Sequence, residues 1–263
     1  MTRFLEDTWA LTRRWLVHLR RDRMSLTLGI IQPLIMLTLV GPLLHHVVRD
    51  AGELQAALKL RFQTDDYLTF LFSGVAAFTI LVNSTLGGIP LIFDRETGFL
   101  DKILAAPVSR ASIVASRFVY VIIYSLMQVG IVGAVAVAIG VRPVDPVMAV
   151  LSLVGFGTLL CAGITALSLT LAFVLPHHSI FFAITGFLLS PLLVLSPTFV
   201  ARASMPGWMQ TVAQFNPMTH AIEPIRAAFL GTPSNALVSA GCLIAFDVVC
   251  FALAIRTFRK NLE

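Results

Sequence analysis

Long apolar runs, separated by polar segments, set the pattern of this chain. They cover residues 25–48, 67–93, 112–141, 147–175 and 236–255, with a further run that begins near Ser179. Each run can cross a bilayer as a helix, which takes about 20 apolar residues, and no ten-residue segments of alternating polarity suggest a membrane barrel. The pattern therefore predicts an all-α integral membrane protein with six transmembrane helices, in which residues 1–263 form a single transmembrane domain.

Residues 1–23 precede the first apolar run and have an amphipathic pattern. On a helical wheel Trp9 and Trp15 fall on one half, with most of the apolar residues, while Arg13 and Arg14 fall on the other. A helix of this kind lies in the membrane surface, with tryptophans at headgroup depth and arginines toward anionic lipid and water. We therefore expect a cytoplasmic interface helix that contacts membrane lipid. Simple anchoring is its most general use.

A charged segment, residues 94–110, lies between the second and third predicted spans and must therefore lie at one membrane face. Its apolar residues recur at helical spacing from Phe99 and Leu100, and Pro107 ends the pattern. The spacing predicts a short helix that leaves Glu96 and Asp101 facing water. An ordinary solvated loop is the alternative interpretation.

Residues 199–231 are neither polar enough for a free loop nor continuous enough for a span. They contain Pro206, Trp208 and the Asn216-Pro217 pair, which is typical of a helix start. We expect a re-entrant pair of helices at the outer face, where irregular backbone is tolerated only against protein or a wet cavity.

Composition and charge agree with a membrane location. The chain is 57% hydrophobic and 13% charged, with 19 Lys and Arg against 14 Asp and Glu. The basic residues gather at span ends, which does not imply nucleic acid. In the six-span layout most of them lie on one side, so the positive-inside rule predicts a multi-pass cell-membrane protein with both termini and residues 94–110 in the cytoplasm. Arg117, near the cytoplasmic edge of the third span, is expected to snorkel to the headgroups.

Sequence motifs for catalysis are missing. The chain has no phosphate-binding GxxxxGK[ST], no nucleophile elbow and no HExxH, so we expect no enzyme activity and no cofactor bound by this chain. Cys161, Cys242 and Cys250 fall inside apolar runs and are expected to be core residues, and no metal site is expected. Asp247, near the middle of the last span, favours a different function class, an ion-coupled carrier or channel, although a structural role is the main alternative.

The charged segment resembles the cytoplasmic coupling segment of ATP-binding-cassette (ABC) type-2 exporter permeases of the daunorubicin-resistance and multidrug kind. The residues that carry this resemblance are Glu96, Gly98, Phe99, Leu100, Asp101, Pro107 and Arg110. A second part lies near the C-terminus, where a Pro-Gly-Trp run and an Asn-Pro segment lead to an arginine before the last span. Its residues are Pro206, Trp208, Asn216, Pro217, Glu223 and Arg226. One departure is Leu195-Ser196-Pro197-Thr198-Phe199, where the family often has Ser-Gly with Phe-Phe-Pro. The resemblance therefore leaves the shape of the outer gate open.

The resemblance implies a transmembrane permease subunit of an ATP-driven exporter. Residues 94–110 would dock in a groove of a separate ATPase subunit, which binds ATP and Mg²⁺, and the helix bearing Trp9, Arg13, Arg14 and Trp15 would add to that surface. Two copies, or one copy with a similar partner, would form a path between their first, second and fifth spans. With few tyrosines and tryptophans, the composition favours an amphipathic drug, lipid or glycolipid over a polysaccharide.

Overall fold

The computed structural model describes residues 2–21, 23–43, 67–105 and 109–262, which contain helices and no strand. The prediction of an all-α protein is thus confirmed for these residues. The helices are α1 Thr2–Arg21, α2 Arg23–Ile35 with a π-helical continuation Met36–Val40, α5 Tyr67–Leu86, α6 Ile89–Glu96, α7 Phe99–Leu104, α8 Arg110–Ala138, α9 Pro146–Val174, α10 His178–Val194, the 3-10 turn η2 Arg202–Ser204, α11 Gly207–Ala213, α12 Pro217–Leu230 and α13 Ala236–Leu262.

Among the described residues, four helical stretches are long and apolar enough to cross a membrane. They are Tyr67–Glu96, Ala111–Ala138, Pro146–Val174 and Ala236–Phe258, and they coincide with the second, third, fourth and sixth predicted spans. The first and fifth predicted spans correspond to shorter apolar helices, Gly29–Leu43 and His178–Val194. The protein is therefore a multi-pass helical membrane protein, while the count of six spans stays a prediction.

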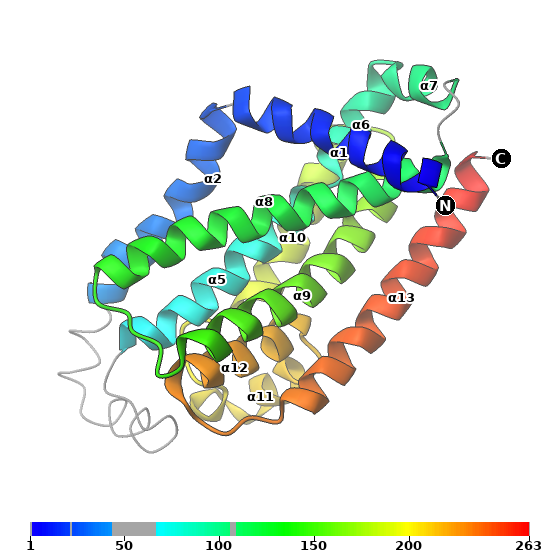
Figure 1. Cartoon of the computed structure of the whole chain (residues 1–263). Coiled ribbons are helices and arrows are strands. Elements are labelled where there is room, and N and C mark those ends of the chain that lie inside the picture. Colours follow the sequence, from blue (N-terminus) through cyan, green and yellow to red (C-terminus); the bar gives the residue numbers. More distant parts are fainter. Residues whose placement is uncertain (1, 22, 44–66, 106–108, 263) are drawn as a thin grey trace.

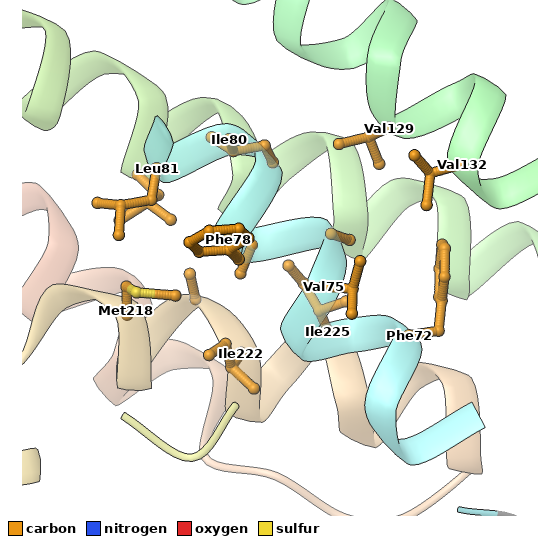
Figure 2. Close-up of a cluster of buried hydrophobic side chains, with 14 of the residues drawn as sticks. Phe72, Val75, Phe78, Ile80, Leu81, Val129, Val132, Met218, Ile222 and Ile225 are labelled. Carbon is orange, nitrogen blue, oxygen red and sulfur yellow. The ribbon is translucent and has the colours of Figure 1, made fainter. Parts of the chain in front are cut away.

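Helix α5 is the centre of the bundle and is buried along almost its whole length. Its side chains Phe72, Val75 and Phe78 meet residues of α8 on one side and of α12 on the other (Figure 2). The α8 residues are Val129 and Val132, and the α12 residues are Met218, Ile222 and Ile225. Because lipid is as apolar as these side chains, close van der Waals packing holds such helices together.

Small residues bring α5 and α6 against α9. The break between α5 and α6 lies at Gly87 and Gly88, and the Gly88 N–H donates to the Ser168 hydroxyl at 2.9 Å. That hydroxyl donates in turn to the Thr85 carbonyl at 2.6 Å. A side chain at Gly88 would meet the Ser168 backbone, so the close contact requires glycine.

The two ends of the bundle carry different elements (Figure 1). Helices α1, α6 and α7 lie at the end where the N-terminus and the C-terminus are found, and α11 lies at the opposite end. Both termini and the segment that begins at Asp94 therefore share one end, as the six-span layout requires. Their cytoplasmic location stays a prediction.

Candidate functional site

The last turn of α6 carries three consecutive charged residues, Asp94, Arg95 and Glu96, and each contacts a different part of the bundle. Asp94 is buried and its Oδ2 accepts a hydrogen bond from Arg117 Nη2 of α8 at 2.7 Å. Arg14 of α1 lies 3.9 Å from the other carboxylate oxygen. The prediction that Arg117 snorkels to the headgroups is wrong, because its side chain is only 3% exposed and the Asp94 carboxylate holds it inside the protein.

Arg95 binds the C-terminal end of α9. Its guanidinium donates to the carbonyl oxygens of Phe173 and Pro176, each at 3.0 Å, and to that of Leu175. The last carbonyls of a helix have no partner within the helix and carry partial negative charge, so a cation at this end is stabilising. Arg95 therefore joins α6 to the end of a helix about 80 residues later.

Glu96 binds the N-terminal end of α10. Its Oε1 accepts from the backbone N–H of His178 at 2.9 Å, and its Oε2 lies 2.8 Å from Nδ1 of the same residue. The α10 cap residue His177 makes no capping side-chain hydrogen bond of its own, and its ring nitrogen lies 3.9 Å from Glu96. The His178 ring also stacks on Phe93, with centroids 5.2 Å apart. The glutamate thus supplies the anion that a helix start favours.

The chain turns at Gly98, after which α7 forms the predicted short helix. Gly98 has φ of 66°, a left-handed conformation that costs other residues energy. Leu100 is buried, whereas Phe99 is 37% exposed and its ring lies 4.4 Å from the Arg14 guanidinium. Asp101 lies in α7 and Arg110 is the first residue of α8, while Pro107 lies outside the described residues.

Helix α1 packs along α8 through part of the half that carries most of its apolar residues, together with Thr8. Thr8, Thr12 and Leu19 are buried, and Thr12 Oγ1 lies 3.4 Å from the Ser116 carbonyl oxygen. Trp15 is half-buried, because the Arg117 guanidinium lies 3.6 Å from its ring and Tyr120 packs beside it.

The other predicted residues of α1 are exposed. Trp9 is 58% exposed, and Arg13 and Arg14 are exposed as well. The headgroup depth of Trp9 stays a prediction. The helix therefore divides its predicted residues between a protein contact and the outer surface.

A cavity of about 860 Å³ opens between α1, α2, α5, α6, α8 and α10. Its polar wall contains Asn83, whose Nδ2 donates to Gln128 Oε1 at 3.0 Å, and Gln128 Nε2 donates to the Tyr124 hydroxyl at 2.6 Å. Tyr120 stacks on Tyr124, with centroids 6.0 Å apart. The other lining residues are mostly apolar and include Phe78, Val82, Leu86, Pro90 and Phe182. The cavity therefore combines a large apolar surface with a few polar groups, which is typical of small-molecule sites.

Arg226 is a fully buried cation near the opposite end. Its guanidinium is covered by protein and donates to Ser73 Oγ at 3.0 Å and to the Pro197 carbonyl oxygen at 2.6 Å. It also lies 3.5 Å from the Phe70 ring. Arg226 thus joins α12 to α5 and to the loop after α10.

Asn216 and Pro217 start α12 as predicted. Asn216 Oδ1 accepts from the Met218 N–H at 3.0 Å, and Nδ2 donates to the Leu192 and Leu195 carbonyls at the end of α10. Pro206 precedes α11, in which Trp208 is 66% exposed.

Glu223 lies 3.4 Å from Arg202 in a half-exposed ion pair. The helices α11 and α12 both lie within residues 199–231, the segment predicted to be a re-entrant pair. The re-entrant position of this segment stays a prediction.

Asp247 lies on α13 against α9. Asp247 is mostly buried beside Gly163 of α9. A side chain added at Gly163 would overlap both the Asp247 carboxylate and the Phe246 ring. Asp247 Oδ1 has no hydrogen-bond partner among the described residues. The residue does not line the 860 Å³ cavity, so the structure does not bring it together with the other predicted site residues.

The comparison with known families decides the class of this protein. The model of a family described as ABC-2 type transporter matches residues 6–230. The chain belongs to this family. It is therefore the transmembrane component of an ABC transporter, and members of this ABC-2 family work with an ABC ATPase partner.

Relatives of this ABC-2 chain are transport permeases. The ycf38 protein of Cyanophora paradoxa, named as a transport permease, is 33% identical over 277 residues, which cover 99% of this chain and 90% of that protein. The ycf38 protein of Porphyra purpurea is 34% identical over 236 residues, covering 88% of this chain and 76% of that one. The daunorubicin resistance ABC transporter permease protein DrrB1 of Streptomyces coeruleorubidus is 26% identical over 204 residues, covering 75% and 71%.

Sequence reasoning about this ABC-2 chain placed Asp94 and Arg95 in the segment 94–110 but missed their contacts, and it missed His178 as part of the site. A usable signal existed for Asp94 and Arg117, since opposite charges at the facing ends of consecutive apolar runs can pair in an antiparallel helix pair. Tyr120 and Tyr124 were also missed, although residues four apart share a face of a helix, so their spacing on α8 is a signal that places both on one wall.

Proposed function

We propose that this chain is the permease subunit of an ATP-driven exporter that moves an amphipathic drug, lipid or glycolipid outward from the cytoplasm or inner leaflet. Residues 94–110 are the segment that docks on the ATPase. ATP and Mg²⁺ are held by that partner, and two copies of this chain, or one copy with a similar permease, complete the path. Residues Pro206, Trp208, Asn216, Pro217, Glu223 and Arg226 belong to the outer gate in this proposal.

The observation that carries the proposal is the set of contacts made by the charged end of α6. A push on α7 reaches Asp94, Arg95 and Glu96 through one tight turn at Gly98. From there it passes to α1 and α8, to the end of α9, and to the start of α10. Shifting a two-state population from 1:99 to 99:1 takes about 5.5 kcal/mol of differential binding, so a stiff link is needed. Ion pairs and helix-end contacts provide such a link better than a solvated loop does.

The cavity supports the amphipathic substrate class. It lies between α2, α5 and α10, the elements of the first, second and fifth predicted spans, and Trp15 and Asp94 belong to its wall. A movement of α6 therefore changes the shape of the cavity directly. Its volume of about 860 Å³ is at the upper end of the roughly 300–1,000 Å³ of small-molecule sites.

The ion-coupled alternative depends on Asp247. An ionisable group inside a membrane helix is a functional candidate by default. Asp247, however, packs in the α9–α13 contact beside Gly163 and not on the cavity wall. We therefore assign Asp247 a structural role in the proposed exporter.

Charge reversal on α7 tests the coupling assignment. Asp101→Lys and Lys102→Glu change the helix that should meet the ATPase, whereas Asp50→Lys makes a change of the same size in the predicted outer loop. We expect the two α7 variants to insert and fold normally but to retain at least tenfold less of the ATPase on co-purification from native membranes, since like charges at an interface cost several kcal/mol when desolvated. Asp50→Lys should retain it fully. If the α7 variants bind the ATPase and export like the parent chain, the assignment of residues 94–110 is wrong.

A further inference from the structure

A second hollow lies beside the 860 Å³ cavity, on the charged side of α1. Its volume is about 670 Å³ and it is lined by Ala10, Arg13, Arg14, Trp15, Val17, His18, Arg21 and Asp94. Trp15, His18 and Asp94 also line the larger cavity, so the two hollows are neighbours that share these three residues of their walls. An elongated molecule that passes these side chains would reach both hollows.

The hollow on α1 is electropositive. Arg13, Arg14 and Arg21 line it together with a single carboxylate, that of Asp94. The Arg117 guanidinium already binds Asp94 Oδ2 at 2.7 Å, which compensates the acidic charge from the protein side. Arg13 and Arg21 are exposed and eight residues apart, so they lie on the same side of the helix. This arrangement attracts an anion, and the planar guanidinium groups suit phosphate or carboxylate oxygens.

The larger cavity has the opposite character on the far side of Trp15 and His18. Phe78, Val82 and Phe182 are part of its wall, and polar side chains such as Gln32, Thr79 and the linked Asn83–Gln128–Tyr124 group are a minority there. Such a wall accepts apolar groups and fixes few polar ones. The charge and the apolar surface thus lie end to end, as in an acidic lipid.

We propose that the two hollows form one binding site for a single anionic amphiphile, with its acidic head against Arg13, Arg14 and Arg21 and its apolar body along Phe78, Tyr120 and Phe182. This inference rests on the proposed function, because it names the chemical class of the exported molecule as an acidic lipid or a compound of that form. It differs from general membrane anchoring, in which the arginines meet bulk lipid and no apolar chain enters the protein. A soluble anion alone would leave the apolar cavity without a ligand.

Tryptophan fluorescence can test this site, because Trp15 forms part of both hollows. The chain has three tryptophans, so the variant Trp9→Phe, Trp208→Phe keeps Trp15 as its single reporter. It is reconstituted in phosphatidylcholine vesicles to which one of two brominated lipids is added, either brominated phosphatidylglycerol or brominated phosphatidylcholine. Bromine atoms on the acyl chains quench nearby tryptophan. We expect brominated phosphatidylglycerol to quench Trp15 at a several-fold lower mole fraction than brominated phosphatidylcholine. A matching variant that keeps only Trp208, on α11, should show no such preference.

Arginine variants give the second measurement. Arg13→Gln and Arg21→Gln should each lower the preference for phosphatidylglycerol about fivefold, the effect of one basic residue near an acidic headgroup. Arg142→Gln removes the same charge from an exposed site beyond the other end of α8 and should change nothing. Equal quenching by both lipids would overturn the proposal. So would loss of the preference on adding soluble glycerol phosphate, which would indicate a site for the head alone.

The test also separates this proposal from the proposed function. If Arg13→Gln and Arg21→Gln keep the lipid preference but lose the ATPase, the arginines serve a protein partner and the lipid site is rejected. If the α7 variants described above bind the ATPase normally while the Trp15 preference holds, the coupling assignment fails and the lipid site stands as a site on α1.

Discussion

Arg117 and Asp94 form a buried ion pair between α8 and α6, with Nη2 and Oδ2 2.7 Å apart and side-chain exposures of 3% and 12%. Removal of one member leaves a buried charge without its partner, and the cost of such a change is about 3–5 kcal/mol. Asp94→Asn and Arg117→Gln should therefore each lower the thermal stability of the purified protein strongly. The double variant should recover most of the loss, because no charge is then left alone.

Arg14→Gln is the matched control for this pair. Arg14 lies 3.9 Å from Asp94 and its side chain is 41% exposed, so its loss should cost less than about 1 kcal/mol. If the double variant Asp94→Asn, Arg117→Gln loses as much stability as the two single variants together, Asp94 and Arg117 do not act as a pair.

Gly98 allows a second comparison of two variants. A side chain at Gly98 or at Gly130 would meet no atom within 4 Å, so size plays no part. The φ of Gly98 is 66°, whereas Gly130 lies within the helix α8. Gly98→Ala should cost about 1–2 kcal/mol and reorient α7, while Gly130→Ala should be neutral or stabilise by about 0.5–1 kcal/mol.

Thermal unfolding and the rate of trypsin cleavage at the exposed Lys102 measure the Gly98 effect. Faster cleavage of Gly98→Ala with normal cleavage of Gly130→Ala is the expected result. Equal rates in both variants would mean that α7 does not depend on the left-handed turn.

Much of the architecture could be predicted from periodicity and local chemistry. The α7 helix followed from the spacing of Phe99 and Leu100, and the start of α12 followed from Asn216 and Pro217, because these signals act within one or two turns of a helix. The four long spans followed from length alone. Local reasoning of this kind does not say which helices become neighbours.

The missed contacts are those made between residues far apart in the sequence. Glu96 and His178 are 82 residues apart, and nothing near either one indicates the other. Arg117 is a further example. An arginine at the end of a span can reach the headgroups or pair with a carboxylate, and the sequence near Arg117 does not show that Asp94 lies beside it. Composition also does not say where rare residues lie, and Tyr120, Tyr124 and Trp15 gather at one cavity although the chain has only three tyrosines and three tryptophans.

Arg226 gives a third prediction, at the opposite end of the bundle. Its planar guanidinium binds Ser73 on α5 and the Pro197 carbonyl oxygen in the loop after α10. The ammonium group of a lysine cannot reproduce both contacts. Arg226→Lys should therefore cost about 2–4 kcal/mol despite keeping the charge. Arg202→Lys, in the half-exposed pair with Glu223, should cost less than about 1 kcal/mol. Similar melting temperatures for the two variants would contradict the structural role of Arg226.

Asp247→Asn distinguishes the exporter from the ion-coupled alternative. The amide keeps the size and shape that fit beside Gly163 and removes a charge whose Oδ1 has no hydrogen-bond partner among the described residues. Because an intramembrane carboxylate costs roughly 2.5–3.5 kcal/mol to insert, we expect the variant to be at least as stable as the parent chain. Transport by the complete complex, measured at several pH values, should keep its parental rate, since in the proposed exporter ATP and not proton movement through Asp247 drives the cycle. A variant that folds and binds the ATPase but transports nothing would instead assign the coupling step to Asp247 and overturn the structural role given to it here.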